Sequence, residues 1–298
     1  LAVARARSVR GRSVLVLERE ASFGAGVSAR NSEVVHAGLY YAQGSRKARA
    51  CVQGKQMLYA YCRERGVECR AVGKLVVATD EEQSREGLPR LTARAEANGV
   101  HDLRAMTRAD VRALEPAVEC TSALWSPSSG IVDSHGLMQA LLADAQDGGA
   151  DVAYGARVVA GRLEGRQQAV LVRTVAVGGA DEAGGGEEGP GTGAEDAVLL
   201  CDEVVNCAGL GAVRVGRALR PGAGRCHALR AAYARGSYFS LKPGSLRPLP
   251  QRLIYPLPDP NLGGLGIHAT VDLAGQVRFG PDVEWLGDGG VLPGGPGG

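Results

Sequence analysis

Glu18 is the first residue whose position indicates chemistry, because it directly follows a short apolar run. Residues 1–9 are typical of the second half of a helix, Gly11 ends it, and residues 13–17 predict a buried parallel strand. In a dinucleotide-binding βαβ unit, an acidic residue after the second strand bonds the ribose, about 20 residues beyond the glycine fingerprint. Acidic residues at strand ends are more often solvated charges, but the loop of small and polar residues at 23–33 favours the binding interpretation. We expect Glu18 to bind a ribose, and the phosphate loop to precede Leu1.

Histidine is the side chain best suited to accept a proton near neutral pH, because its imidazole has a pKa near neutrality. His36 lies in the string ARNSEVVHAGLYY, residues 29–41, and His268 follows a short apolar run. A histidine beside two valines is more often structural, and one at a strand end is as often a surface residue. His101, His135 and His227 occur in polar or turn contexts and receive no role.

The composition excludes several classes of function. The 298 residues carry a net charge of +2, so no nucleic-acid partner is expected. No apolar run approaches the roughly 20 residues of a membrane-spanning helix, which leaves at most peripheral membrane contact. The seven cysteines form no CxxC pair and no Cys/His cluster, so we expect reduced thiols and no metal site.

The string at residues 29–41 resembles the flavin-contacting segment of the L-2-hydroxyglutarate dehydrogenase family, within the D-amino-acid-oxidase-like superfamily. The resemblance continues through SRKARACVQG (45–54), GKL (73–75), GIVD (130–133) and VNCAGL (205–210). It then includes RGSY (235–238), YPLPD (255–259) and LGIH (265–268). Each piece is a weak signal alone, whereas their shared order along nearly the whole chain is strong.

The resemblance implies FAD as the cofactor and a set of residues that contact it. Asn31 and Ser32 can hydrogen-bond the pyrophosphate and ribityl hydroxyls, and Gly38 lets the backbone approach a planar ring without a Cβ clash. Ala208 and Gly209 would form a second turn against the nucleotide, and the strand at Val158 would present backbone groups to the adenine. The cofactor-binding residues expected are therefore Glu18, Asn31, Ser32, Gly38, Val158, Ala208 and Gly209.

The reaction implied is oxidation of a small 2-hydroxy acid such as L-2-hydroxyglutarate to the 2-oxo acid. Hydride would pass to the flavin while His36 or His268 accepts the hydroxyl proton, and the sequence leaves open which of them does so. Tyr40, Tyr41 and Tyr255 can donate hydrogen bonds to a substrate carboxylate, although packing alone explains each ring as well. Arg235 or Lys74 can pair with a carboxylate, or be a solvated charge.

The expected fold is α/β: an incomplete Rossmann-like FAD-binding domain and a substrate domain with a mixed or antiparallel sheet, both discontinuous in sequence. We expect FAD-binding parts at 1–73 and 131–225, and substrate-domain parts at 74–130 and 226–284. The segment 178–196 is rich in glycine and acidic residues without a large apolar side chain, which predicts a disordered insertion. A disordered tail is expected at 285–298.

Capping residues set the expected helices. Ser45 begins a helix that Gly66 ends, Asp80 begins one that ends near Gly99, and Thr107 with Asp110 forms a capping box. Asp133 caps a further helix that stops at Gly148. Strands are expected at 74–79, 152–154, 157–163, 169–177, 198–205, 231–241, 253–255, 265–269 and 276–279.

Three interpretations compete with hydroxy-acid oxidation. Another oxidoreductase of the superfamily would act on glycerol 3-phosphate or an amino acid, a non-catalytic fragment would serve only as an interaction module, and a nicotinamide enzyme is the least favoured. Because the phosphate loop and a closing C-terminal segment are expected outside the sequence, we expect these 298 residues to bind FAD poorly. A quinone or an electron-transfer protein would accept the electrons, and eukaryotic relatives imply a mitochondrial location.

Overall fold

A computed structural model describes residues 1–164, 166–174, 196–220, 230–242, 244, 248–258 and 266–286. The chain divides into two compact units, each built from two separate stretches of sequence. Unit 1 comprises Leu1–Arg30 and Met138–Ala231, and unit 2 comprises Asn31–Leu137 and Ala232–Gly298. Each unit is described by itself below.

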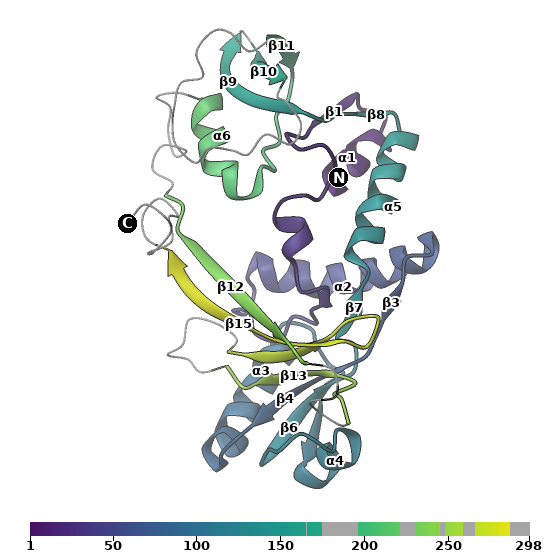
Figure 1. Cartoon of the computed structure of the whole chain (residues 1–298), viewed down its shortest axis with the longest axis vertical. Coiled ribbons are helices and arrows are strands. Elements are labelled where there is room, and N and C mark those ends of the chain that lie inside the picture. Colours follow the sequence, from purple (N-terminus) through teal and green to yellow (C-terminus); the bar gives the residue numbers. More distant parts are fainter. Residues whose placement is uncertain are drawn as a thin grey trace. The chain divides into compact units, whose positions relative to one another are not determined.

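Unit 1 combines a parallel strand pair with an antiparallel sheet (Figure 1). Its helical segments are α1 (Ala2–Ser8), η1 (Val27–Arg30), most of α5 (Ser134–Asp147), η3 (Gly209–Gly211) and α6 (Ala212–Leu219). Strand β1 (Val14–Leu17) pairs in parallel with β8 (Ala150–Ala153). Strands β9 (Ala156–Glu164), β10 (Gln167–Thr174) and β11 (Asp196–Cys201) form the antiparallel sheet in the order β11-β10-β9. Apolar side chains of β10 pack on Leu219 of α6, which gives this sheet its own core.

Unit 2 is organised around a seven-stranded mixed sheet in the order β12-β15-β14-β13-β4-β6-β5. These strands are β4 (Lys74–Ala78), β5 (Arg104–Thr107), β6 (Ser122–Ser126), β12 (Tyr233–Ser240), β13 (Leu253–Pro256), β14 (His268–Val271) and β15 (Val277–Leu286). A three-stranded sheet joins β2 (Val34–Val35), β7 (Gly130–Val132) and β3 (Cys69–Arg70). In Figure 1, β12 and β15 run side by side as a long curved ribbon.

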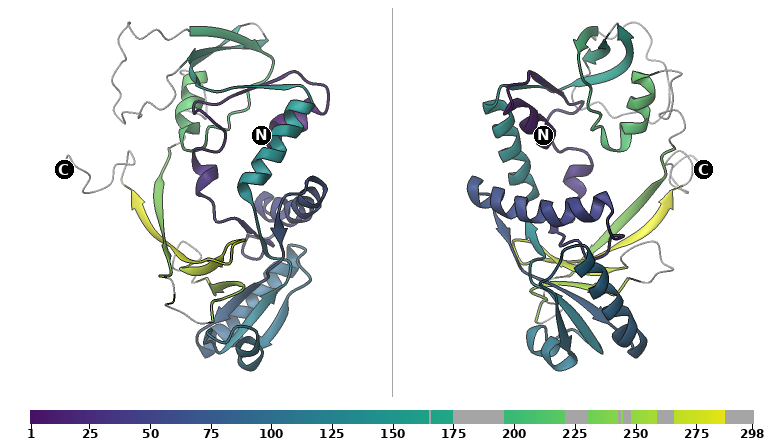
Figure 2. Two further views of the ribbon diagram at one scale, coloured as in Figure 1. Left: turned by 45° about the vertical axis from the view of Figure 1, so that its right-hand side comes forward. Right: turned by 180° about the vertical axis from the view of Figure 1, so that it is seen from behind.

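The two faces of the seven-stranded sheet are covered by different helices (Figure 2). The π-helical turn η2 (Gln83–Gly87) leads into helix α3 (Leu88–Ala97). On β4, Val76 and Ala78 pack with Leu88, Leu91 and Ala95 of α3. The intervening Leu75 and Val77 pack with Val111 of α4 (Arg108–Leu114). Because side chains alternate along a strand, Lys74 lies on the α3 face of the sheet. The long helix α2 (Arg46–Arg65) contacts the same region of the core through Val52.

The capping residues expected from the sequence begin and end the helices. The Ser45 side chain accepts a hydrogen bond from the Ala48 N–H at the start of α2, and Gly66 ends that helix in the left-handed conformation. Thr107 and Asp110 form the capping box of α4. The Asp133 carboxylate accepts from the Gly136 N–H at the start of α5.

In the second half of the chain, the structure differs from two of the expectations from the sequence. The strand expected at 198–205 ends at Cys201, and Val204 and Val205 are exposed, because in the described part of the chain no strand pairs with them. Two residues of the tail expected from 285 are in a strand, since Trp285 and Leu286 pair with Ala234 and Tyr233 in β12. Most of the expected acidic insertion, and residues 287–298, lie outside the described residues.

The division into units also differs from the expected boundaries at 73/74 and 130/131. Residues 31–73 belong to unit 2 rather than to the part that contains β1. The reason is the small sheet, in which Val34 pairs with Ile131 and Cys69 pairs with Val132. These pairs tie the loop after Arg30 to the middle of the chain.

Candidate functional site

Three neighbouring strands of unit 2 bring a lysine, a tyrosine and a histidine to one face of the sheet. Strand β13 pairs in parallel with β4, so that Tyr255 lies beside Val76, two residues after Lys74. Strand β13 also pairs antiparallel with β14, with Ile254 opposite Ala269. The next pair in this register is Tyr255 and His268, whose side chains therefore lie on the same face as Lys74.

Tyr255 and His268 form a stacked pair inside the unit. Their ring centroids are 3.9 Å apart and the planes differ by 13°. The His268 Nδ1 lies 2.9 Å from the carbonyl oxygen of Gly266. A neutral imidazole that donates from Nδ1 to this carbonyl keeps Nε2 as an acceptor. Burial lowers the pKa of His268, the Lys74 charge lowers it further, and the Gly266 carbonyl opposes both.

Lys74 places its ammonium group against two aromatic rings. Its side chain is only 1% exposed, and Nζ lies 3.8 Å from the Tyr255 ring centroid and 5.6 Å from that of Tyr40. Burial lowers the pKa of Lys74 to about 7. Across the described ranges, no residue forms a hydrogen bond or ion pair with this ammonium.

His36 and Tyr40 come from the segment that follows β2. The Cys51 thiol of α2 donates a hydrogen bond of 3.3 Å to the His36 carbonyl, which holds the backbone here. Burial, followed by the charges of Lys74, His268 and Lys47, lowers the pKa of His36 to about 3. Burial is also the main cause that raises the pKa of Tyr40, whose hydroxyl is buried without a hydrogen-bond partner in the described structure.

Tyr41 and Gly38 are positioned by contacts with helices. Tyr41 accepts a hydrogen bond of 2.9 Å at its carbonyl from the Asn98 side chain, and the exposed Lys47 lies 4.8 Å from the centroid of its ring. Gly38 has a φ of +100°, and a Cβ there would lie 2.8 Å from the Val52 Cγ2. The packing of α2 therefore requires a glycine at this position, independently of any cofactor.

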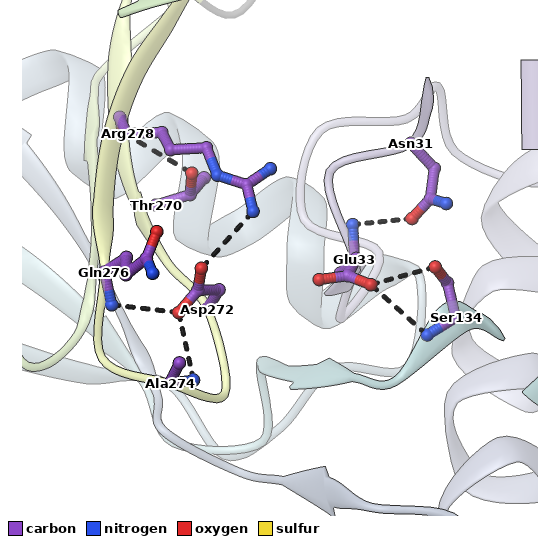
Figure 3. A network of polar contacts seen from close by, with 8 residues as sticks. All are labelled: Asn31, Glu33, Ser134, Thr270, Asp272, Ala274, Gln276 and Arg278. Atoms are coloured by element: carbon purple, nitrogen blue, oxygen red, sulfur yellow. Dashed lines mark hydrogen bonds and ion pairs between the residues drawn. The ribbon is translucent and has the colours of Figure 1, made fainter. Parts of the chain in front are cut away.

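A network of polar contacts fixes the segment before His36 (Figure 3). Asn31 Oδ1 accepts from the Glu33 N–H at 2.7 Å, and Glu33 adopts a φ of 59°. The Glu33 carboxylate accepts from the Ser134 hydroxyl at 2.9 Å, at the first residue of α5. Ser32 is partly buried between these two anchored residues. The backbone leading to His36 is thus held by side chains as well as by the strand pair β2–β7.

A second part of the network in Figure 3 holds the turn between β14 and β15. Asp272 accepts hydrogen bonds at Oδ1 from the backbone N–H groups of Ala274 and Gln276, at 3.0 and 2.9 Å. Its Oδ2 lies 3.3 Å from the Arg278 guanidinium. This turn fixes the pairing of β14 and β15, and with it the position of His268.

Arg235 differs from Lys74 as a candidate for binding a carboxylate. It is exposed on β12, and its guanidinium forms an ion pair with Glu284 directly across the ribbon on β15. Arg235 therefore already has a carboxylate partner. The sequence pattern that sets Lys74 apart is a single lysine between Gly73 and an unbroken apolar run.

Unit 1 contains four of the expected cofactor ligands. Glu18 ends β1, where its Oε1 accepts from the Glu20 N–H at 3.0 Å, and its Oε2 bonds no described residue. Asn206 received no role from the sequence, but its side chain shapes the exposed turn at Ala208 and Gly209. It accepts a hydrogen bond from the Ala208 N–H at 3.2 Å and donates one to the Ala212 carbonyl at 2.8 Å. Val158 lies on β9, the edge of its sheet.

The described part of the chain contains no group of three or more histidine, cysteine or acidic residues placed to hold a metal ion. The six described cysteines are free thiols, and Cys226 lies outside the described residues. None of the described helices is both long enough and apolar enough to cross a membrane.

Comparison with known sequences places the chain among flavoproteins. The family described as FAD dependent oxidoreductase (DAO) matches residues 1–296. The chain is 38% identical over 304 residues to the mitochondrial L-2-hydroxyglutarate dehydrogenase of Arabidopsis thaliana, covering 96% of the chain and 60% of that protein. The enzymes of that name from Homo sapiens, also mitochondrial, and Escherichia coli K12 are each 32% identical. Each of these two matches covers 91% of the chain, which spans 55% of the human enzyme and 57% of the Escherichia coli enzyme.

Comparison with solved structures identifies the same fold. The L-alpha-glycerophosphate oxidase of Mycoplasma pneumoniae, a structure with FAD bound, matches with a TM-score of 0.78 at 20% identity, covering 97% of this chain and 69% of that one. Glycine oxidase from Geobacillus kaustophilus matches with a TM-score of 0.71 at 18% identity, with coverage of 95% and 68%. At these identities the likeness concerns the fold alone.

Proposed function

The chain belongs to the FAD dependent oxidoreductase (DAO) family, and from this premise we propose that it takes part in oxidising a small 2-hydroxy acid, with L-2-hydroxyglutarate as the first candidate. The named relatives at 30% identity or more support this substrate. Since the chain spans about 60% of the Arabidopsis relative, activity, substrate and electron acceptor are all part of the proposal. A quinone or an electron-transfer protein remains our candidate acceptor, and the mitochondrial names of the eukaryotic relatives support that location.

The residues present fit a flavin. In unit 1, the Glu18 Oε2 can accept a hydrogen bond from a ribose hydroxyl. FAD, when bound, supplies the acceptor of the hydride. We propose Glu18, Asn31, Ser32, Gly38, Val158, Ala208 and Gly209 as its ligands.

The observation that carries the proposed reaction is the contact between His268 and Gly266. Because Nδ1 faces a carbonyl at 2.9 Å, Nε2 is the nitrogen that can accept a proton from the substrate hydroxyl. The imidazolium that results keeps its bond to the carbonyl and its stack on Tyr255. Within the described residues the His36 ring has no comparable partner, and its pKa of about 3 makes it a weak base.

The remaining side chains would orient the substrate. Tyr40 and Tyr255 lie against Lys74 and can donate hydrogen bonds to a carboxylate. Tyr41 lies one residue from Tyr40 and can contribute in the same way. Arg235 would have to exchange Glu284 for substrate, so we propose it only as a secondary contact.

Steady-state kinetics with an artificial electron acceptor test this function, with FAD added in large excess because we expect these residues to bind it poorly. The substrates compared are both enantiomers of 2-hydroxyglutarate, glycerol 3-phosphate and a set of amino acids. We expect oxidation of L-2-hydroxyglutarate, with kcat lowered about 100-fold or more by His268→Asn and less by His36→Asn. The exposed His101→Asn is the matched control. Activity with an amino acid alone would contradict the proposed substrate, and a larger loss in His36→Asn would transfer the base to His36.

A further inference from the structure

The inference concerns the buried ammonium group of Lys74. Its neighbours are aromatic or neutral: Tyr255 from β13, Tyr40 from the segment after β2, and the Cys51 thiol of α2, whose charge when ionised would raise the lysine pKa. The other titratable groups near this region are the imidazoles of His36 and His268, whose lowered pKa values favour the neutral form, and the ammonium groups of Lys47 and Lys55. No carboxylate of the described residues pairs with Lys74.

A second, independent observation lies beside this ammonium. The Tyr40 hydroxyl is buried and donates to no described residue, while the ring of Tyr40 lies 5.6 Å from the Lys74 Nζ. Buried hydroxyl groups in native proteins nearly always have a partner. Two donors from different segments, both without an acceptor, therefore face one region of unit 2.

The two observations share one physical explanation. A buried cation without a counter-charge destabilises a fold, because the ammonium loses its hydration and gains no opposite charge. Contact with the Tyr255 ring offsets part of this penalty and also leaves the three N–H donors of the ammonium unused. An anionic ligand supplies both the missing charge and the missing acceptors.

We propose that Lys74 and Tyr40 form an anion-binding subsite that holds a carboxylate of the 2-hydroxy acid substrate and of its 2-oxo product. This inference rests on the proposed function for the identity of the ligand. The ammonium contributes a charge-assisted hydrogen bond and the phenol a neutral one. The Tyr255 ring contacts and positions the ammonium, and His268 stacks on that ring.

The subsite has a distinct pH dependence. Because burial lowers the pKa of Lys74 to about 7, the ammonium form that binds a carboxylate is lost as the pH rises above that value. A bound carboxylate favours the ammonium form and raises this pKa. Ligand binding near neutral pH therefore takes up protons, and affinity falls with increasing pH.

Isothermal titration of the chain, supplied with FAD, with 2-oxoglutarate tests the subsite without catalysis. Titrations in two buffers of different ionisation enthalpy count the protons taken up, and titrations at about pH 6 and about pH 9 bracket the lysine pKa. We expect Lys74→Met to weaken binding about tenfold or more and to abolish proton uptake, and Tyr40→Phe to weaken it less. Lys74→Arg, which keeps a charge, should retain part of the affinity.

Lys47→Met is the matched control, since Lys47 also lies over a tyrosine ring but is exposed. Circular dichroism of each variant checks that it folds. Equal affinity in wild type and Lys74→Met, or no binding by folded wild type, would overturn the subsite. If Lys74→Met alters the flavin reduction potential but leaves the affinity for 2-oxoglutarate unchanged, the Lys74 ammonium acts on the reduced flavin. That outcome would also overturn the subsite. Binding of 2-oxoglutarate that depends on Lys74, without oxidation of any 2-hydroxy acid, would refute only the proposed function.

Discussion

At the scale of single residues, Lys74 shows how a side chain that weakens a fold can mark a functional site. A lysine that is 1% exposed as a residue and whose ammonium lacks a carboxylate partner in the described structure is unfavourable for stability. Natural sequences keep such groups where binding or catalysis requires them. The sequence raised Lys74 only as one of two cations, because a lysine beside an apolar run reads equally well as a strand-end charge.

The stability of unit 2 should therefore improve when Lys74 is replaced by methionine. The pKa of Lys74 is about 7 in the folded chain, whereas the ordinary value of 10.5 applies to the unfolded chain. Between these values the unfolded chain binds the proton and the folded chain does not, so the free energy of unfolding rises with pH across this window. Below pH 7 both states are protonated, and the penalty of the buried ammonium is fully present. We expect Lys74→Met to raise the free energy of unfolding by about 3 kcal/mol at about pH 6, and by much less at about pH 10.

Urea unfolding at the two pH values measures this difference. Lys47→Met, in which the lost ammonium is exposed, should change the free energy of unfolding little at either pH. A Lys74→Met variant that is less stable than wild type at both pH values would show that the ammonium is compensated in the fold.

At the scale of elements, local signals identified most of the helices but not α6, and they did not indicate the neighbours of each strand. Ser45, Gly66, Thr107 and Asp133 act as caps because capping depends on a few adjacent residues. Bringing His268 to Lys74 depends instead on β13 lying between β4 and β14, a long-range order that no local pattern encodes. The extent of β15 to Leu286 likewise depends on its partner β12.

Gly38 illustrates an element contact that a substitution can test. A side chain there meets two obstacles, the φ of +100° and the Val52 methyl group 2.8 Å from the Cβ position. We expect Gly38→Ala to lower the free energy of unfolding by about 2–4 kcal/mol, from backbone strain and overpacking together. In the Val52→Ala background, Gly38→Ala should lower it by only about half as much, because the clash is removed and the strain remains.

Urea unfolding of the two single variants and the double variant gives this coupling. Gly54→Ala is the control, since Gly54 lies within α2 and a Cβ there meets nothing within 4 Å. It should stabilise the chain slightly through helix propensity. Strict additivity of Gly38→Ala and Val52→Ala would show that the contact with α2 is not what requires the glycine.

At the scale of the whole molecule, the chain is two units with separate hydrophobic cores. In unit 1, Ala4, Ala145 and Ala150 form one cluster, and the sheet with α6 forms another. In unit 2, separate clusters cover the two faces of the seven-stranded sheet. The sequence led us to expect two domains that are each discontinuous along the chain. It did not indicate where the units divide, because that depends on the pairing of β2 and β3 with β7.

Units with their own cores can unfold in separate transitions, and the two tryptophans allow this to be measured. Trp125 and Trp285 both belong to unit 2, and Trp285 is 69% exposed, so fluorescence changes will report mainly on Trp125 and its surroundings. We expect Lys74→Met to shift the urea midpoint followed by fluorescence. Amide hydrogen exchange in β9, β10 and β11 of unit 1 should stay unchanged, because the substituted residue packs only within unit 2. An equal increase of protection in those unit 1 strands would mean that the two units unfold as one cooperative structure.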